Sequence, residues 1–415
     1  MPIRLTPAER KTAKQFADIK KKSGSHSPSP AMLAGVKGIK VKYDFCYLSN
    51  PHATELFLKL FKKDSNKREG LRKFIERYPS QNRSLAEKFE RSVGVPAANI
   101  FVGNGATEII QAVLQNFVEP VGVKLPHSRR SLTPTSKILV PVPTFSPYLE
   151  FVLENVRVIP HQLNKKDDFR LDTNALLTQI KKEKPDTVVL INPNNPDGGY
   201  LNTNELRLLL GTLREVETVI VDESFIHFAE DADVRRLKGA DKRELHFPSY
   251  GGLVKKYPNL IVIKSLSKDF GIAGLRLGYA VMSEKRVSEL LSRGYLWNVS
   301  GFGEYFLDLL NRKDFLKEYE HARLRAIRER DDFFRELSRI KGLKVYPSKA
   351  NMFLVELLDG SRAEDLTVAL LCRYGLYIRL CKDKVGLMGE FIRVASRTAK
   401  ENTKLAQVLR LALSE

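Results

Sequence analysis

The sequence is organised around residues 265–276, Ser265-Leu266-Ser267-Lys268-Asp269-Phe270-Gly271-Ile272-Ala273-Gly274-Leu275-Arg276. This stretch follows the apolar, β-branched run Leu260-Ile261-Val262-Ile263, which predicts a buried strand. An amine that lies next to the core loses part of its hydration and becomes able to attack a carbonyl. Lys268 is therefore a candidate for forming a Schiff base.

Arg276 follows Lys268 in the same stretch and offers a planar, permanently charged guanidinium that suits a phosphate group. Ser265 and Ser267 add hydroxyl donors. A lysine for an aldehyde, combined with arginine and serine for a phosphate, fits pyridoxal 5′-phosphate (PLP). A Ser-x-x-Lys sequence alone is a weak signal that also occurs in ordinary surface loops, so the prediction depends on segments elsewhere in the chain.

A glycine-rich turn upstream predicts a phosphate seat. Asn99-Ile100-Phe101-Val102 is typical of a short strand, and it leads through Gly103-Asn104-Gly105 into a helix with periodic apolar residues. The first amides of a helix lack an intrahelical acceptor and lie at the positive end of the helix dipole. Gly105, Ala106 and Thr107 are thus candidates for phosphate binding.

Two fully apolar segments, Thr187–Ile191 and Thr218–Val221, are typical of central parallel strands. They end in Asn192-Pro193-Asn194-Asn195-Pro196 and in Asp222-Glu223-Ser224-Phe225. Ligands of open α/β sheets gather at such carboxyl ends. An aspartate at the end of a buried strand requires a partner, and a protonated pyridine nitrogen is one.

A further predicted strand at residues 137–142 ends in Pro143-Thr144-Phe145. Phe145 is a candidate to stack on a flat cofactor ring, with packing in the core as the alternative.

The chain has 415 residues, of which 43% are hydrophobic, and a formal net charge of +20. Residues 1–42 contain ten Lys or Arg and two acidic residues, with a predicted helix at Pro7–Lys22 and a Ser/Pro-rich linker at 23–30. The charge makes nucleic-acid binding an alternative function. No helix-turn-helix, Cys/His finger or aromatic RNA-binding stripe accompanies it, so a basic solvated tail and a surface favouring anionic substrates are preferred.

Membrane and secreted classes are disfavoured. No apolar run approaches the ~20 residues of a membrane helix, and the start of the chain lacks the apolar segment of a signal peptide. Cys46, Cys372 and Cys381 form no C-x-x-C pair, which predicts reduced thiols, no metal site and a cytoplasmic location.

Taken together and in this order, the five segments closely resemble class I/II aminotransferases, the PLP enzymes of fold type I. The resemblance implies an α/β fold: a large domain with a mostly parallel seven-stranded sheet covered by helices, and a smaller α+β C-terminal domain. The expected boundaries are a basic N-terminal extension and linker at 1–42, an N-terminal arm joining the small domain at 43–77, a large PLP-binding domain at 78–300 and a small C-terminal domain at 301–415.

The resemblance also implies roles. Lys268 binds PLP covalently and moves the proton of the substrate's α-carbon, and Asp222 pairs with the ring nitrogen. Tyr78 matches the tyrosine that reaches the phosphate from the neighbouring subunit, which implies a homodimer. The implied cofactor-binding residues are Gly105, Ala106, Thr107, Phe145, Asn195, Asp222, Ser265, Ser267, Lys268, Arg276 and Tyr78.

Within this family, the chain is most similar to the branch of histidinol-phosphate aminotransferase and threonine-phosphate decarboxylase. The implied ligand is a small anionic amino acid or amine that carries a phosphate or phosphonate. Arg393 matches the α-carboxylate site, and Arg379 and Arg397 match sites for the carboxylate or the substrate's own phosphate. The implied substrate-binding residues are Arg379, Arg393, Arg397 and Asn50.

Transamination and decarboxylation use the same residues. Finer details, such as Trp297–Ser300 and Tyr346–Asn351, resemble the decarboxylases, whereas transamination is the commoner reaction of the family. We therefore expect an aminotransferase, with a decarboxylase of the threonine-phosphate or serine-phosphate type as the alternative. A nucleic-acid-binding protein with a degenerate PLP fold is a third hypothesis, which the intact cofactor residues disfavour.

Overall fold

The computed structural model describes residues 3–24, 26–66, 71–118, 136–229, 247–295 and 297–414. Contacts within it divide the chain into two units. The smaller unit comprises Met1–Leu48, Pro196–Gly198 and Arg325–Glu415, and the larger comprises Ser49–Asn195 and Gly199–Leu324. These boundaries differ from the expected ones, because the first 42 residues group with the C-terminal unit and residues 301–324 group with the larger unit.

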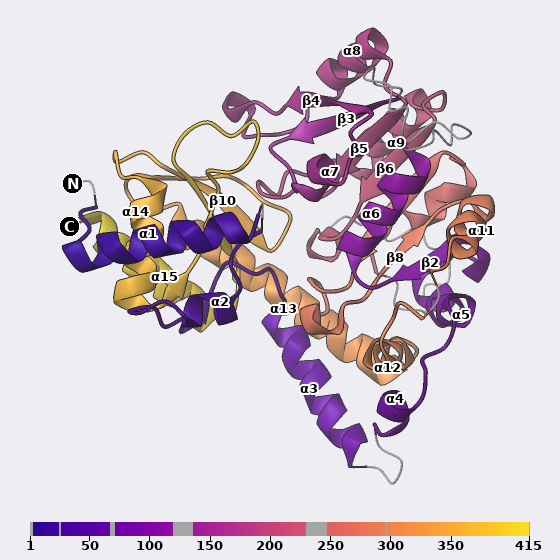
Figure 1. Ribbon diagram of the computed structural model, residues 1–415, viewed down its shortest axis with the longest axis horizontal. Coiled ribbons are helices and arrows are strands. Elements are labelled where there is room, and N and C mark those ends of the chain that lie inside the picture. The colour runs from indigo at the N-terminus through magenta and orange to yellow at the C-terminus, as the bar shows by residue number, and fades with distance from the viewer. Residues whose placement is uncertain are drawn as a thin grey trace, which may run out of the picture. The chain divides into compact units, whose positions relative to one another are not determined.

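The larger unit is built on a seven-stranded sheet (Figure 1) with the strand order β2-β8-β7-β6-β5-β3-β4. β8 is antiparallel to its neighbours β2 and β7, and the other pairs are parallel. The predicted mostly parallel seven-stranded sheet is thus confirmed. Its strands are β2 (Ile100–Gly103), β3 (Ser136–Val142), β4 (Val156–Gln162), β5 (Thr187–Ile191), β6 (Thr218–Asp222), β7 (Leu260–Ser265) and β8 (Gly278–Val281).

Both faces of this sheet are buried, which explains the unbroken apolar runs of its central strands. In β6, Val219 and Val221 belong to one apolar cluster and Ile220 to another. The first cluster includes α3 (Pro51–Ser65), α5 (Asn82–Val93), α8 (Thr173–Glu183), α9 (Thr203–Thr212) and α12 (Gly301–Leu310). The second includes α6 (Ala106–Phe117), α7 (Pro147–Glu150) and α11 (Glu284–Ser292).

The smaller unit holds a four-stranded antiparallel sheet with the order β12-β13-β10-β9 and a parallel pair, β1-β11. This α+β organisation agrees with the predicted C-terminal fold. Its strands are β1 (Tyr43–Asp44), β9 (Leu343–Val345), β10 (Met352–Leu357), β11 (Leu376–Tyr377), β12 (Arg379–Leu380) and β13 (Phe391–Ala395). Its helices are α1 (Pro7–Lys22), α2 (Pro30–Ala34), α14 (Ala363–Ala369) and α15 (Ala399–Ser414).

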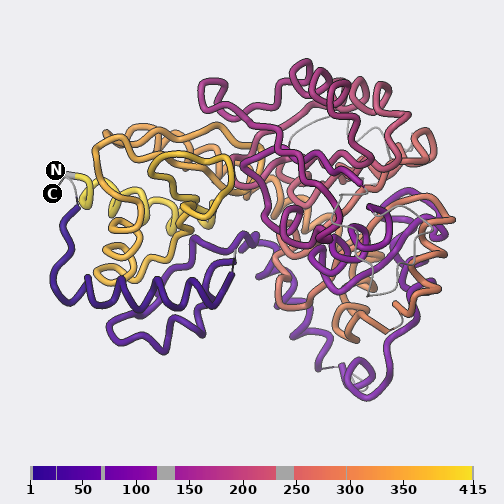
Figure 2. The backbone as a smooth tube through the Cα atoms, turned by 45° about the horizontal axis from the view of Figure 1, so that its top comes forward, coloured from indigo at the N-terminus to yellow at the C-terminus, as the bar shows by residue number. Residues whose placement is uncertain are grey.

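The N-terminal segment packs on this smaller unit. The predicted helix is confirmed as α1, which starts with a capping box formed by Thr6 and Glu9. Phe16 of α1 shares an apolar cluster with Leu33 and Leu371. Figure 2 shows this indigo segment alongside the yellow C-terminal part of the chain. The expectation of a solvated tail is wrong for the described residues, because Glu9, Thr12 and Phe16 of α1 are buried.

Two pairs of consecutive helices are separate elements. α3 ends at Ser65, and α4 (Lys73–Glu76) is a separate short helix. Further along the chain, α12 is followed by the separate helix α13 (Lys313–Leu337). Among the described residues, none of the helices combines the length and apolar content needed to cross a bilayer.

Candidate active site

The sheet topology brings the predicted cofactor residues to one edge of the larger unit. β3, β5, β6 and β7 are parallel, and β2 has the same direction because it pairs with antiparallel β8. The carboxyl ends of these strands therefore share one edge, and β8 begins there. Gly103 and Ser265 are both register partners of Gly278. Open α/β sheets bind ligands at this edge.

One end of the edge has the features of an anion site. Gly105 has a φ of 81° and is the N-cap of α6, which no side chain caps. A Cβ on Gly105 would lie 2.5 Å from Nη2 of Arg276, so only glycine lets the guanidinium approach this turn. The Oγ of Ser267 is buried and has no hydrogen-bond partner among the described residues. Ala106 and Thr107 are the first two residues of α6 and directly follow Gly105.

Asp222 lies further along the edge, at the end of β6, and is buried. Its Oδ2 accepts a hydrogen bond from the Tyr148 hydroxyl at 2.8 Å, and its Oδ1 accepts one from the Ser224 amide at 2.9 Å. Burial raises the pKa of Asp222, although the hydrogen bonds from Ser224 and Tyr148 act in the opposite direction. Sequence analysis did not identify Tyr148, because α7 reaches Asp222 only through the fold.

The turns that follow β3 and β5 are joined. The Asn194 side-chain amide donates to the carbonyl of Pro143 at 3.0 Å. Asn195 is buried, and Phe145 is half-buried against the second apolar cluster. These two predicted residues therefore belong to neighbouring turns at the same edge.

The turn that carries Lys268 is fixed to the start of α3. The backbone N–H of Asn50 donates to the Lys268 carbonyl at 2.9 Å, and the Thr54 hydroxyl donates to the Gly271 carbonyl at 2.8 Å. Gly271 has a φ of 64°, and a Cβ there would lie 2.3 Å from the Asn50 carbonyl oxygen. The side chain of Lys268 is half-buried. Nδ2 of Asn50 is buried without a hydrogen-bond partner among the described residues.

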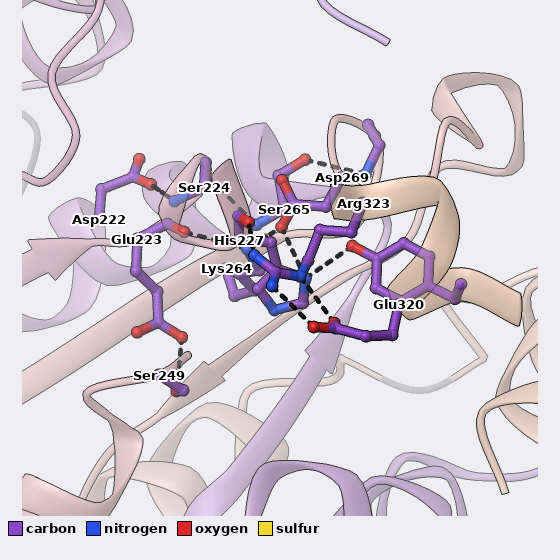
Figure 3. A network of polar contacts seen from close by, with 12 residues as sticks. Asp222, Glu223, Ser224, His227, Ser249, Lys264, Ser265, Asp269, Glu320 and Arg323 are labelled. Atoms are coloured by element: carbon purple, nitrogen blue, oxygen red, sulfur yellow. Dashed lines mark hydrogen bonds and ion pairs between the residues drawn. The ribbon is translucent and has the colours of Figure 1, made fainter. Parts of the chain in front are cut away.

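A buried polar network supports the same turn (Figure 3). Lys264 and Asp269 form an ion pair in which both side chains have no exposed surface. Lys264 Nζ also donates to the Glu223 carbonyl at 3.1 Å. Asp269 Oδ2 lies 3.3 Å from Nδ1 of His227, which lies 2.8 Å from the Tyr319 hydroxyl. Burial raises the pKa of Asp269 to about 6, against the opposing effect of Lys264.

Sequence analysis did not identify this network. The available signal was a charged residue, Lys264, within an otherwise apolar strand, and an aspartate directly after the predicted catalytic lysine. A buried charge requires a partner, so these two residues were candidates for each other.

The smaller unit contains the predicted substrate arginines. Arg379 is 4% exposed, and its Nη2 contacts the two carboxylate oxygens of Asp383 at 2.9 and 2.7 Å. Arg393 is 8% exposed and donates from Nη2 to the Cys46 carbonyl at 2.6 Å. Burial and the neighbouring Arg379 lower the pKa of Lys384 to about 8. Sequence analysis did not identify Lys384, which adds a third cation to this region.

Two further predicted residues make other contacts. Arg397 is paired with Glu401 at 2.9 Å, at the start of α15. Tyr78 is 87% exposed in the larger unit and contacts Trp297, with 5.8 Å between the ring centres. Their roles remain predictions.

The residues at the sheet edge fit PLP. The buried, unpartnered hydroxyl of Ser267, the uncapped start of α6 and the Arg276 guanidinium against Gly105 suit a phosphate. Asp222 supplies a buried carboxylate for a protonated ring nitrogen. Lys268 supplies an amine in the same turn as Ser267.

The family follows from these features and from comparison with known proteins. The chain belongs to the aminotransferase class I and II family, whose model matches residues 51–409. It is a PLP-dependent enzyme, an aminotransferase or a decarboxylase, with the fold type I architecture.

Individual relatives indicate the reaction more narrowly than the family does. The chain is 47% identical over 403 residues to an L-serine phosphate decarboxylase of Campylobacter jejuni, covering 97% of each chain. The solved structure of a decarboxylase from Sulfurospirillum multivorans matches with a TM-score of 0.86 and 42% identity, covering 98% of this chain and 97% of that chain. A histidinol-phosphate aminotransferase of Methanococcus aeolicus is 27% identical over 340 residues, covering 81% of this chain and 82% of the relative.

These findings change the order of the two reaction hypotheses. The sequence-based preference for transamination is supported less well than its alternative, because the relatives with the higher identity and coverage are decarboxylases. The branch assignment itself is confirmed.

The ion pair below the Lys268 turn gives a testable prediction for stability. We expect Lys264→Met to lower the free energy of unfolding by about 3–5 kcal/mol, because it leaves the carboxylate of Asp269 buried without its cation. The double variant Lys264→Met/Asp269→Leu should regain most of this loss, since no uncompensated charge remains. Urea denaturation of the PLP-loaded proteins measures both effects.

Lys285→Met, which changes an exposed lysine on α11, is the matched control and should stay within about 0.5 kcal/mol of the unaltered protein. Equal stability of Lys264→Met and Lys285→Met would show that the buried pair does not hold this turn.

Proposed function

We propose that this enzyme decarboxylates O-phospho-L-serine, releasing carbon dioxide and O-phosphoethanolamine. The observation that carries the proposal is the match, over nearly the whole chain, to a relative named L-serine phosphate decarboxylase. The fold alone does not separate this reaction from transamination, because both use the same residues at the sheet edge.

The charge distribution in the smaller unit supports an anionic substrate. Arg379, Lys384 and Arg393 are all less than 10% exposed, and Asp383 is the carboxylate that pairs with Arg379. O-Phospho-L-serine brings a carboxylate and a phosphate, which such cations are suited to bind. In this proposal Arg393 takes the carboxylate, and Arg379 and Lys384 take the phosphate.

At the sheet edge, the proposed roles follow the order of the strands. Gly105, Ala106, Thr107, Ser265, Ser267 and Arg276 hold the cofactor phosphate. Asp222 keeps a proton on the ring nitrogen, Asn195 donates to the ring oxygen, and Phe145 stacks on the ring. Lys268 binds the cofactor covalently and delivers a proton to the substrate's α-carbon after carbon dioxide leaves.

Bound PLP supplies an electron sink for the bond at the α-carbon that lies perpendicular to its ring. The residues of this chain must therefore set which bond takes that position. Arg393 orients the carboxylate in this proposal, and the phosphate contacts of Arg379 and Lys384 fix the other end of the substrate. Asn50, whose Nδ2 is buried without a partner among the described residues, supplies a further donor.

We also propose a homodimer. Tyr78 is 87% exposed although it is a large aromatic residue, and exposed aromatic side chains are enriched at protein interfaces. In a dimer, its hydroxyl would reach the cofactor phosphate of the neighbouring subunit.

The reaction is tested by incubating PLP-loaded protein with O-phospho-L-serine, with and without 2-oxoglutarate, and following the products by mass spectrometry. We expect O-phosphoethanolamine and carbon dioxide in both mixtures. Glutamate that forms only with 2-oxoglutarate would instead establish an aminotransferase. O-Phospho-L-threonine and histidinol phosphate serve as comparison substrates.

The role of Lys268 is tested by Lys268→Ala. This variant should lose covalently bound PLP, measured by mass spectrometry after borohydride reduction, and should lose carbon dioxide release. Lys255→Ala removes an exposed lysine of the same unit and should retain both. A covalent adduct in Lys268→Ala would assign the attachment to another lysine.

Lys384 predicts a pH dependence. Because its folded pKa is lowered to about 8, its positive charge is present below that pH and is lost above it. We expect KM for O-phospho-L-serine to rise by about three- to ten-fold as the pH increases through this value. Lys384→Arg stays charged and should show a flatter profile, so matching profiles would exclude Lys384 from the substrate site.

A further inference from the structure

The last turn of α1 reaches the predicted substrate region of the smaller unit. Lys20 Nζ lies 2.9 Å from Oδ2 of Asp383, and the two side chains are 18% and 28% exposed. The same carboxylate accepts hydrogen bonds from Nη2 of Arg379 at 2.9 and 2.7 Å. One carboxylate therefore joins a lysine of the N-terminal segment to an arginine assigned to the substrate.

The position of Lys20 is fixed by its surroundings. Its Nζ also donates to the carbonyls of Gly24 and His26, at 2.7 and 2.9 Å. These three acceptors use the three hydrogens of the ammonium group. Lys20 is therefore not an ordinary surface lysine with a mobile side chain.

The segment that carries Lys20 is itself anchored at both ends of α1. At its start, Glu9 is paired with Arg373 at 2.7 Å. Beyond its end, the Pro28 carbonyl accepts hydrogen bonds from the hydroxyls of Tyr377 and Tyr47, at 2.8 and 3.3 Å. The contacts with Arg373 and Tyr377 hold α1 and Pro28 against the π-helix Leu370–Tyr374 and against β11, which precede Arg379 in the chain.

Sharing Asp383 has an electrostatic consequence. Burial opposes the ionisation of Asp383, but Arg379 and Lys20 hold its pKa below the usual value, so the carboxylate is charged at neutral pH. Two cations share this one anion, and a formal positive charge remains. Without Lys20, Asp383 would interact with Arg379 alone and would neutralise it more completely.

The comparisons show that this segment is shared with a relative. The match to the Campylobacter jejuni decarboxylase spans 403 residues and 97% of this chain, so it must include most of residues 1–42. The family model, by contrast, begins only at residue 51. The docked segment is thus part of what this chain shares with a relative named L-serine phosphate decarboxylase.

We infer that the N-terminal segment is a working part of the substrate site, in which Lys20 acts through Asp383 to keep Arg379 positioned, and its charge less fully offset, for the substrate's phosphate. This inference rests on the proposed function for the identity of the substrate. Lys20 is a positioning residue, since it contacts Asp383 rather than the substrate.

The test compares Lys20→Met with Lys14→Met, which removes an exposed lysine from the same helix. Steady-state kinetics of the PLP-loaded proteins with O-phospho-L-serine should show KM raised by about three- to ten-fold in Lys20→Met, with kcat changed less than about two-fold. Lys14→Met should match the unaltered protein. Lys20→Arg keeps the charge and should restore most of the affinity, which a loss of folding would not allow.

A double-mutant cycle with Asp383→Asn identifies the route of the effect. If Lys20 acts through Asp383, Lys20→Met should change KM by less than about two-fold in the Asp383→Asn background. An equal effect of Lys20→Met in both backgrounds, or identical kinetics of Lys20→Met and Lys14→Met, would overturn the inference.

Binding of inorganic phosphate separates this inference from the proposed function. If the unaltered enzyme released no carbon dioxide from O-phospho-L-serine, the proposed function would fail. Calorimetric titration of PLP-loaded protein with inorganic phosphate would still test Lys20, with weaker binding expected in Lys20→Met. Equal binding by Lys20→Met and the unaltered protein would overturn the inference independently of the reaction.

Discussion

The buried ion pair between Lys264 and Asp269 is the constraint on which the candidate active site depends. Asp269 directly follows Lys268, so the position of its carboxylate limits the path of the backbone that presents the Lys268 amine proposed for catalysis. The pair lies without solvent contact, where an ion pair requires good geometry and additional hydrogen bonds to be tolerated. Lys264 donates one such bond to the Glu223 carbonyl, and Nδ1 of His227 lies 3.3 Å from Oδ2 of Asp269.

The turn that carries Lys268 lies between the residues proposed for the cofactor phosphate and those proposed for the cofactor ring. Lys264 and Ser265 end β7, which lies between β8 and β6 in the sheet. The residues proposed to bind the cofactor phosphate lie at β2, β8 and β7. The residues proposed to contact the cofactor ring follow at β6, β5 and β3. A cofactor with an anionic arm and a flat ring matches this order. The strand order alone therefore separates the side chains proposed for the cofactor phosphate from those proposed for its ring.

Much of this arrangement could be predicted from the sequence. Apolar β-branched runs located the strands, and the polar residues directly after them located Asp222, Asn195 and Lys268 at one edge, because parallel strands end together. Tyr148 and His227 could not be assigned in this way. Their relevance depends on contacts with residues distant in the chain, and neither lies in a sequence pattern that indicates a partner.

The reaction was harder to predict than the fold for a physical reason. The residues at the sheet edge are proposed to hold a cofactor that both reactions share, so their pattern carries little information about which bond breaks. The information lies in substrate orientation, which in our proposal depends on the smaller unit. The basic N-terminal residues were predicted as a solvated tail because their charge is visible in the sequence, whereas the partners of Glu9 and Lys20 are more than 360 residues away.

The pairing of β1 with β11 has a practical consequence for how the protein is delimited. Tyr43 and Asp44 pair with Leu376 and Tyr377, yet the family match begins at residue 51. A recombinant chain trimmed to the family boundaries would lose one strand of this pair, α1 and the carbonyl of Cys46 that Arg393 contacts. The shared family region is thus smaller than the physical unit, and a truncated enzyme that binds PLP normally would still lack part of the scaffold around the arginines proposed for the substrate.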